Sequence, residues 1–446
     1  MLVPGFIIGS FLSGLLYDRC SRLWLTLATT VGAGVCTLMT PYMTSLTGML
    51  ALRVASGLFC GALDTGANTI VSSIWESDSG PYMQALYLSY TVGGIVAPFV
   101  TRPFMSSENE KHTGGHLNGD EKGIDDHTRV VSLTNSQLTS NNYSNISQRL
   151  YSRFESEAMN ISQFSQESSM LFERTSQIHY AFIVTGVLAF MSSFPYLAMI
   201  VSGRFSSKSK PRRCEITVSG DQESLTDDSL THTESRDVTL KRPDHRNKCL
   251  LLVCLAAINI LYNAVEDSFG DFVITFCLEY LQWSNTQSVA LLSLYWLASC
   301  IGGLTGILLV RVIGSGRLLA VMHVGWILTF GLASLGSVFR IHALIWFSMP
   351  ASGFFMVQII PAVFSWTAEN VCPVTGKVSS LFLIATGVGI AGNPSVIGYL
   401  MERFTFVSFV YVLTGEAILC AVCNFLALLI ASRQSSGRGP YPPTKA

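Results

Sequence analysis

The side chains best suited to chemistry share one face of a long apolar stretch over residues 47–74. At 100° per residue, two charged residues, one amide and two glycines fall within about 80° of one another: Arg53, Gly57, Gly61, Asp64 and Asn68. A charge at the centre of a membrane helix costs about 3 kcal/mol on insertion scales, so this face indicates a packed interior beside a polar cavity. We interpret Asp64 as an ion- or substrate-binding residue and the two glycines as helix-packing residues. Arg53 fits a binding role and a structural ion pair equally well.

A second concentration of polar residues lies in the stretch 249–275. Two amides, two carboxylates and a glycine fall within about 100° of one another on a helix: Asn259, Asn263, Glu266, Asp267 and Gly270. Amides and the neighbouring Tyr262 can pair with the hydroxyls of a polar ligand, and hard carboxylate oxygens suit Na⁺. Asn263 and Glu266 are the strongest candidates here, whereas Asp271 is expected at the external interface.

The composition shows which elements position these residues. The chain has 446 residues, of which 49% are hydrophobic and 13% charged, against about 25% charged in ordinary soluble domains. Much of the charge lies in residues 105–178 and 204–247, and the rest divides into eleven apolar segments, each long enough for a span of roughly 20 residues. An all-α polytopic membrane protein is expected. The long apolar runs argue against a soluble enzyme and against an outer-membrane barrel, whose strands would be short and alternating. Because 28 basic and 29 acidic residues nearly cancel, the composition also argues against a nucleic-acid binder.

The eleven predicted spans divide into five and six. They cover residues 1–17, 23–41, 47–74, 82–104, 179–203, 249–275, 286–310, 317–339, 342–366, 378–400 and 405–431. The first five form a predicted N-terminal helical bundle over 1–203, and the other six form a C-terminal bundle over 248–431. A linker over 204–247 separates the bundles, and a tail covers 432–446.

Lysine and arginine predict the orientation of the spans through the positive-inside rule. With the loop after the first span in the cytoplasm, most loop cations are cytoplasmic, and only Arg102, Arg340 and Arg403 are external. The linker and the C-terminus are then cytoplasmic, and the membrane is expected to be the plasma membrane. The same orientation places 105–178 outside, where three N-x-S sequons either predict glycosylation or arise by chance in a segment rich in Ser and Asn: Asn142, Asn145 and Asn160.

The turn after the first span reads Gly14-Leu-Leu-Tyr-Asp18-Arg19-Cys-Ser-Arg22. It resembles the G-x-x-x-D-R-x-G-R loop of the major facilitator superfamily, with Ser21 where that family has glycine. The resemblance implies a two-bundle transporter fold with charge clusters that latch one conformation; an ordinary basic turn is the alternative. The residues expected to form such latches are Asp18, Arg19, Arg22, Glu76, Arg311 and Glu369.

In that family the loop follows the second helix of twelve, whereas here it follows the first. The resemblance therefore implies that this chain corresponds to spans two to twelve of a twelve-helix fold, with the first helix missing. The stretch from Gly306 to Arg317 repeats the pattern at the matching turn of the second half, where Val310 replaces the aspartate.

Residues 50–105 are similar to one branch of the superfamily, sodium-dependent glucose transporter 1 with the major facilitator domain-containing 4 group. The similarity rests on Leu63-Asp64-Thr65-Gly66-Ala67-Asn68, on Tyr82 to Leu86 and on Gly93 to Pro98. It implies uptake of glucose or a related hexose, either coupled to sodium or facilitated. By the internal symmetry of the fold, Gln358 and Trp366 lie on the span that pairs with the Asp64 helix, and they become candidate sugar contacts.

The predicted binding residues are therefore Asp64, Asn68, Asn259, Asn263, Glu266, Gln358 and Trp366, with Na⁺ at Asp64 or Glu266. We expect a secondary transporter that moves a small solute by alternating access, with the lipid bilayer as its surroundings and with no enzyme activity, cofactor, other metal or nucleic-acid partner. Three alternatives stay open. They are a uniporter, a proton-coupled carrier of another solute that uses Glu266 or His323, and a membrane sensor or scaffold that transports nothing.

Overall fold

The structure is a computed structural model that describes residues 2–101, 178–202 and 245–436. Every regular element in these ranges is helical, which confirms the all-α class expected from the composition. The predicted external segment with its three sequons, nearly all of the predicted linker and most of the tail lie outside the described residues.

Helices occupy all eleven ranges predicted to span a membrane. Those of the N-terminal part are α1 (Leu2–Leu16), α2 (Arg22–Met39), α3 (Leu46–Trp75), α4 (Gly80–Thr101), α6 (Ile178–Met191) and α7 (Phe194–Val201). Those of the C-terminal part are α8 (His245–Glu279), α9 (Asn285–Ile313), α10 (Ser315–Val338), α11 (His342–Met356), α12 (Ile359–Asn370), α13 (Gly376–Arg403) and α14 (Ser408–Ser436). Short 3₁₀ helices, η1 (Thr40–Tyr42) and η2 (Glu76–Asp78), follow α2 and α3.

Nine helical segments in the described ranges are long and apolar enough to cross a membrane. The broken helices α6–α7 and α11–α12 each form one such segment. Helix α1 is apolar but has 15 residues, and α4 is not among the nine, since it mixes Gln84, Ser89 and Thr91 with its apolar residues. The chain is a multi-pass membrane protein, and nine of the eleven predicted spans meet this criterion.

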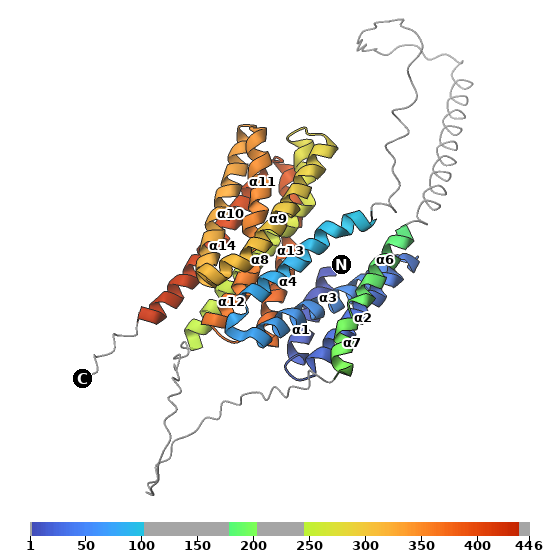
Figure 1. The fold of residues 1–446 in the computed structure, drawn as a ribbon. Helices are drawn as coiled ribbons and strands as arrows, with labels where there is room; N and C mark the ends of the chain where they lie inside the picture. Colours follow the sequence, from blue (N-terminus) through green and yellow to red (C-terminus); the bar gives the residue numbers. More distant parts are fainter. Residues whose placement is uncertain (1, 102–177, 203–244, 437–446) are drawn as a thin grey trace, which may run out of the picture. The chain divides into compact units, whose positions relative to one another are not determined.

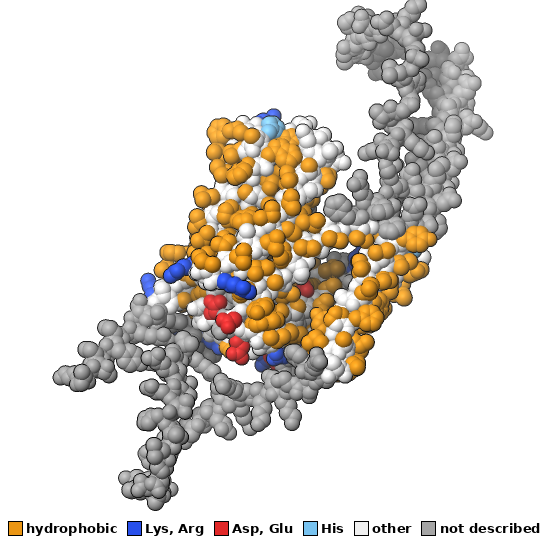
Figure 2. Space-filling model, viewed as in Figure 1, with side chains coloured by type: hydrophobic (Ala, Val, Ile, Leu, Met, Phe, Trp, Pro, Cys, Tyr) orange, Lys and Arg blue, Asp and Glu red, His pale blue; other side chains and the backbone are white. Residues whose placement is uncertain are grey.

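Apolar side chains cover the outside of the helices, as Figure 2 shows for one face. Leu304, Leu308, Val324 and Leu328 on α9 and α10 are each more than half exposed. A water-soluble monomer rarely exposes so large an apolar surface, whereas a helix surrounded by hydrocarbon needs one because all its backbone polar groups are paired internally.

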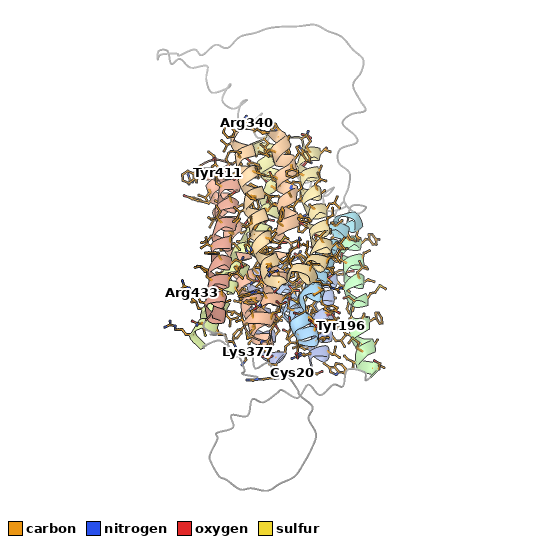
Figure 3. The ribbon with its side chains drawn as sticks, turned by 60° about the vertical axis from the view of Figure 1, so that its left-hand side comes forward. Cys20, Tyr196, Arg340, Lys377, Tyr411 and Arg433 are labelled. Carbon is orange, nitrogen blue, oxygen red and sulfur yellow. The ribbon has the colours of Figure 1, made fainter. Side chains whose placement is uncertain are left out.

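Basic side chains mark the two ends of the helices. Lys377 at the start of α13 and Arg433 near the end of α14 lie toward one end, together with Cys20 of the α1–α2 turn, and Arg340 lies at the other (Figure 3). This is the separation of loop cations on which the predicted orientation depends. Which end faces the cytoplasm stays a prediction.

The described residues 2–97 and 185–436 belong to one compact unit, and residues 98–101 and 178–184 belong to a second. The contacts described below lie within the first unit. Its C-terminal helices, drawn from yellow-green to red in Figure 1, share one apolar core built around large buried aromatic side chains: Phe269, Phe276, Trp326, Phe330, Phe364, Phe382 and Phe409. The predicted division into bundles at 204–247 stays a prediction.

Helices α1 and α3 pack closely because each carries two glycines one turn apart. A Cβ atom on any of these four residues would collide with a backbone carbonyl of the opposite helix: Gly5, Gly9, Gly57 and Gly61. The contact is thus a reciprocal small-residue interface, and the prediction that Gly57 and Gly61 serve helix packing is confirmed. It fixes the rotation of α3 and therefore the direction in which Asp64 points.

Candidate functional site

Asp64 is an exposed carboxylate in an otherwise buried stretch of α3. Its neighbours Thr65, Gly66 and Asn68 are buried, and Asn68 Nδ2 donates a hydrogen bond to the backbone carbonyl of Asp64 at 2.9 Å. Asp64 lies well inside this 30-residue helix. A carboxylate accessible at such depth indicates a water-accessible space within the protein, because contact with hydrocarbon would be costly.

Two tyrosines of α4 connect Asp64 with Glu266 of α8. The Tyr90 side chain interacts electrostatically with both carboxylates and also with Asp267, and it is 70% exposed. Tyr87, one turn earlier, interacts with the same two carboxylates and with the side chain of Asn68. The structure thus places three of the predicted binding residues, from distant parts of the sequence, within electrostatic range of the same two tyrosines.

The C-terminal helices complete this group with two more tyrosines. The side chains of Tyr262 and Glu266, one turn apart on α8, form a hydrogen bond. Tyr295 of α9 interacts electrostatically with Glu266 and Tyr90. Both added tyrosines are buried: Tyr262 lies beside Trp326 with ring centroids 6.1 Å apart, and Tyr295 beside Phe269 at 4.3 Å. Packing therefore fixes their rings, and the Tyr295 hydroxyl donates a hydrogen bond to Met356 Sδ at 3.5 Å. We call Asp64, Asn68, Tyr87, Tyr90, Tyr262, Glu266 and Tyr295 the carboxylate–tyrosine cluster.

Of the two predicted asparagines of α8, Asn263 bonds to another helix and Asn259 bonds within α8. Asn263 Nδ2 donates to the carbonyl of Asn259 at 2.8 Å and to Thr386 Oγ1 of α13 at 3.0 Å. Asn259 is fully buried, and its Nδ2 donates to the carbonyl of Leu255. Its Oδ1 accepts no hydrogen bond from the described residues. In this conformation Asn263 joins α8 to α13, and Asn259 has no access to solvent.

Gln358 lies in a contact between the N-terminal helices (α1 to α7) and the C-terminal helices (α8 to α14). Gln84 Nε2 of α4 donates to the backbone carbonyl of Gln358 at 3.1 Å, at the break between α11 and α12. The two carboxamide oxygens converge on Gly306 of α9. Trp366, the other predicted contact on this span, is buried, with its indole nitrogen beside Gly316 at the start of α10. These contacts of Gln358 and Trp366 are all with residues outside the carboxylate–tyrosine cluster.

A second contact between the two parts joins the α1–α2 turn to α13. Asp18 Oδ1 accepts a hydrogen bond from the backbone amide of Gly376, the first residue of α13, at 3.1 Å. A Cβ atom on Gly14 would collide with Ser380, and one on Gly376 would lie 2.8 Å from the Gly14 carbonyl oxygen. Thr69 of α3 also donates to Ser379 at 3.0 Å. These contacts lie near the end of the helices that carries Cys20 and Lys377 (Figure 3).

Comparison with known proteins agrees with this two-part arrangement. A family description of the Major Facilitator Superfamily matches residues 1–106. The solved structure of the transporter FucP in its outward conformation superposes with a TM-score of 0.62 and 12% identity, over 96% of this chain and 89% of FucP. The chain has the major facilitator fold.

Curated relatives point to the same superfamily. Sodium-dependent glucose transporter 1 of Xenopus laevis is 22% identical over 435 residues, which cover 96% of this chain and 73% of the relative. Major facilitator superfamily domain-containing protein 4A of Danio rerio is 22% identical over 453 residues, which cover 97% and 79%. These matches confirm the resemblance to the major facilitator superfamily that the loop motif indicated.

The predicted latch residues take different places in this major facilitator fold. Arg22 Nη1 donates to Ser73 Oγ at 2.6 Å and so joins α2 to α3 within the N-terminal part. Glu369 accepts a hydrogen bond from Ser315 at the start of α10 and interacts electrostatically with Asp78 of η2. The other three predicted latch residues are exposed: Arg19, Glu76 and Arg311. Of the six, Asp18 makes the hydrogen bond that joins the two parts.

Sequence reasoning missed the two tyrosines of α4 and Gln84 as functional candidates. Tyr87 and Tyr90 are three residues apart, and therefore neighbours on a helix. Their spacing was the available signal, but aromatic residues at that spacing are equally typical of a helix core. The partner of Asp18, 358 residues away, left no signal in the sequence.

Proposed function

We propose that this protein is a secondary transporter that moves glucose or a related hexose by alternating access, with Na⁺ as the coupling ion. The observation that carries the proposal is that Tyr90 interacts with both Asp64 and Glu266. These carboxylates come from α3 and α8, on opposite sides of the predicted linker. A ligand held between them therefore contacts both bundles and can bias their relative position.

The chemistry of the cluster suits a hydroxyl-rich solute together with a small cation. Tyrosine hydroxyls donate and accept hydrogen bonds, the Asn68 amide does both through separate atoms, and the rings of Tyr87 and Tyr90 offer apolar faces to a sugar ring. Ionised carboxylates supply hard oxygen ligands for Na⁺. Binding of Na⁺ would neutralise carboxylate charge in the cluster, and the gain in sugar affinity must be matched by an equal gain in Na⁺ affinity.

The contacts of Asp18 and Gln84 support alternating access. Both residues bond to the C-terminal part, and the Asp18 bond lies near the helix end that carries Cys20 (Figure 3). Opening that end requires both hydrogen bonds to break, while the glycine contacts between α1 and α3 can stay intact. We assign that end to the cytoplasm, with the C-terminus, and assign the protein to the plasma membrane with glycans on the opposite side.

The name of one relative supports the choice of solute and ion, since the Xenopus laevis protein described above is called sodium-dependent glucose transporter 1. The test is uptake of labelled glucose by the purified protein in liposomes, first with sodium and then with choline. Asp64→Asn is the informative variant, because it removes the charge and keeps the shape. Asp271→Asn is the matched control, since Asp271 is an exposed carboxylate farther along α8.

Sodium-dependent uptake that Asp64→Asn weakens and Asp271→Asn keeps would support the proposal. Equal uptake in sodium and choline would show that transport is not coupled to Na⁺ and would favour a uniporter. Uptake driven by a pH gradient in choline would identify a proton-coupled carrier. Absence of uptake for a panel of hexoses would overturn the choice of solute, and the sensor or scaffold would then be the next hypothesis.

A further inference from the structure

Two buried side-chain oxygens at the contact between α4 and the α11–α12 break accept no hydrogen bond from the described residues. They are Gln84 Oε1 of α4 and Gln358 Oε1 at the break. Gln84 is 1% exposed, and Gln358 is fully buried. Each oxygen loses its hydrogen bonds to bulk water when it is buried, and this cost in free energy is offset only if another donor reaches it.

The two amide nitrogens fix the direction in which these oxygens point. Gln84 Nε2 donates to the Gln358 carbonyl at 3.1 Å, and Gln358 Nε2 donates to the Phe354 carbonyl at 3.2 Å. Turning either amide over would place its oxygen against a carbonyl oxygen, and two acceptors cannot form a hydrogen bond. Both nitrogens are therefore committed to backbone carbonyls, and both oxygens stay directed toward α9.

Gly306 of α9 is the residue on which the two oxygens converge. A Cβ atom on Gly306 would lie 2.8 Å from Gln84 Oε1 and 3.0 Å from Gln358 Oε1. The two oxygens are therefore roughly 6 Å apart at most, which one small molecule with two donors can bridge, since a hydrogen bond to a water oxygen spans about 2.8 Å. The Cα hydrogens of Gly306 are weak donors and do not replace such a molecule.

The ligand must supply two hydrogens to two uncharged oxygens. A water molecule gives one hydrogen to each of them, and its own oxygen can accept hydrogen bonds in return. A cation such as Na⁺ would need several more oxygen ligands and, inside a membrane, a counter-charge, whereas Gln84 and Gln358 are both neutral. The chemistry of the pair therefore favours water over an ion.

We propose that one ordered water molecule is bound between Gln84 Oε1 and Gln358 Oε1, beside Gly306, and forms part of the joint between α4 and the C-terminal helices. The water donates to both oxygens. Helix α4 is then held to the α11–α12 break by one direct hydrogen bond, from Gln84 Nε2, and by one water bridge, which is nearly as favourable in enthalpy as a direct bond.

The contacts around the water give it a role when this joint opens. A Cβ atom on Gly303 of α9 would lie 3.0 Å from Leu88 of α4. One on Gly80, next to the start of the same α4 contact, would lie 3.0 Å from Val310. Helix α4 thus packs along the face of α9 that carries the water. When α4 moves away, the bridge can break at one hydrogen bond, and water entering the gap satisfies the freed oxygen. This role, unlike the site itself, rests on the alternating access proposed above.

The first test is a structure of the purified full chain that shows ordered water, in the conformation that keeps the bond from Gln84 to the Gln358 carbonyl. We expect one peak of density within about 3.2 Å of both Oε1 atoms. A direct hydrogen bond between the two carboxamides would overturn the inference. Density that shows other buried waters and no peak at this position would also overturn it.

A double-mutant cycle tests the bridge by a second route. Gln358→Met removes the carboxamide and keeps the backbone carbonyl to which Gln84 Nε2 donates, so a shared water is the hydrogen-bonded link between the two side chains. Maleimide labelling of Val310→Cys reports opening, because Val310 is 6% exposed and lies against Gly80. Gln84→Met and Gln358→Met should each speed labelling. The double variant should fall short of the product of the two effects by about twofold or more, because the first change already releases the water.

Gln287→Met is the matched control, since Gln287 is an exposed glutamine in the first turn of α9, and its effect should multiply with that of Gln84→Met. Effects of Gln84→Met and Gln358→Met that multiply in the same way would overturn the bridge. Size-exclusion chromatography checks the fold of each variant, and the density of the unmodified protein decides the outcome if a variant does not fold. Neither test uses a solute, so a negative result leaves the proposed function standing, and failure of glucose uptake leaves the water site standing.

Discussion

Asp18 accepts a hydrogen bond at 3.1 Å from the backbone amide of Gly376, 358 residues further along the chain. Gly376 is the first residue of α13, and the N-cap residue Thr375 makes no side-chain capping bond. A carboxylate at this position both accepts from a free amide and faces the positive end of the helix dipole. The turn after α1 therefore supplies the cap that α13 lacks locally, and the two parts of the chain are joined through it.

Removing this cap should open the contact between α1 and α13. Asp18→Ala loses about 1 kcal/mol of capping energy, which raises the population of the separated state about fivefold. Ser380, 7% exposed and packed against Gly14, is the reporter. In a Ser380→Cys background, maleimide labelling of that cysteine should be about fivefold faster with Asp18→Ala. Asp271→Ala is the control, and equal labelling rates in the two variants would contradict a latch at Asp18.

The glycine contact between α1 and α3 should limit stability. Gly61→Ala places a Cβ atom against the Phe6 carbonyl, and overpacking of this kind costs about 1–3 kcal/mol. Gly392→Ala on α13 meets no atom within 4 Å, so it gains helix propensity without a clash. Thermal unfolding in detergent should show a lower midpoint for Gly61→Ala and an unchanged or higher one for Gly392→Ala. A similar midpoint for both would mean that α1 and α3 can move apart at no cost.

Much of the fold could be predicted because the signals are local. Apolar runs gave the helix ranges, and the 100° period placed Gly57, Gly61 and Asp64 on one face of α3. The break between α11 and α12 was not predicted, although the sequence carries its signal. Pro361, in the first turn of α12, has no amide hydrogen for the Val357 carbonyl four residues earlier, and the break lies at that residue.

The site was harder to predict because its members meet through tertiary packing. Asp64 and Glu266 were identified one by one from the cost of burying charge. Nothing in the sequence showed that Tyr90 interacts with both. Gln358 was expected at a sugar site from symmetry, yet its backbone carbonyl bonds Gln84. The polarity of a residue indicates that it needs a partner, but only the fold determines which partner it finds.

Tyr90 should affect ion coupling more than folding. Tyr90→Phe removes the hydroxyl that interacts with Glu266 and Asp64 and keeps the ring. A hydroxyl that contacts the bound ion or its carboxylates contributes about 0.5–1.5 kcal/mol, so the sodium concentration for half-maximal uptake should rise about 2- to 13-fold. Tyr411→Phe is the matched control, because Tyr411 is an exposed tyrosine on α14 (Figure 3). An equal shift of the half-maximal sodium concentration in both variants would show that Tyr90 does not belong to the ion site.

The predicted orientation can be tested with two positions at opposite ends of the helices. Cys20 is an exposed free thiol in the α1–α2 turn, and Arg340 is an exposed residue at the other end (Figure 3). Because arginine-rich loops stay on the cytoplasmic side, a membrane-impermeant maleimide added to intact cells should label Arg340→Cys and leave Cys20 unmodified. Permeabilised cells should give labelling at both, with the modified peptides identified by mass spectrometry. Labelling of Cys20 in intact cells would show that the protein has the opposite orientation in the membrane. The contacts of Asp18 and Gln84 would then close the external end, and the cluster would face the cytoplasm in this conformation.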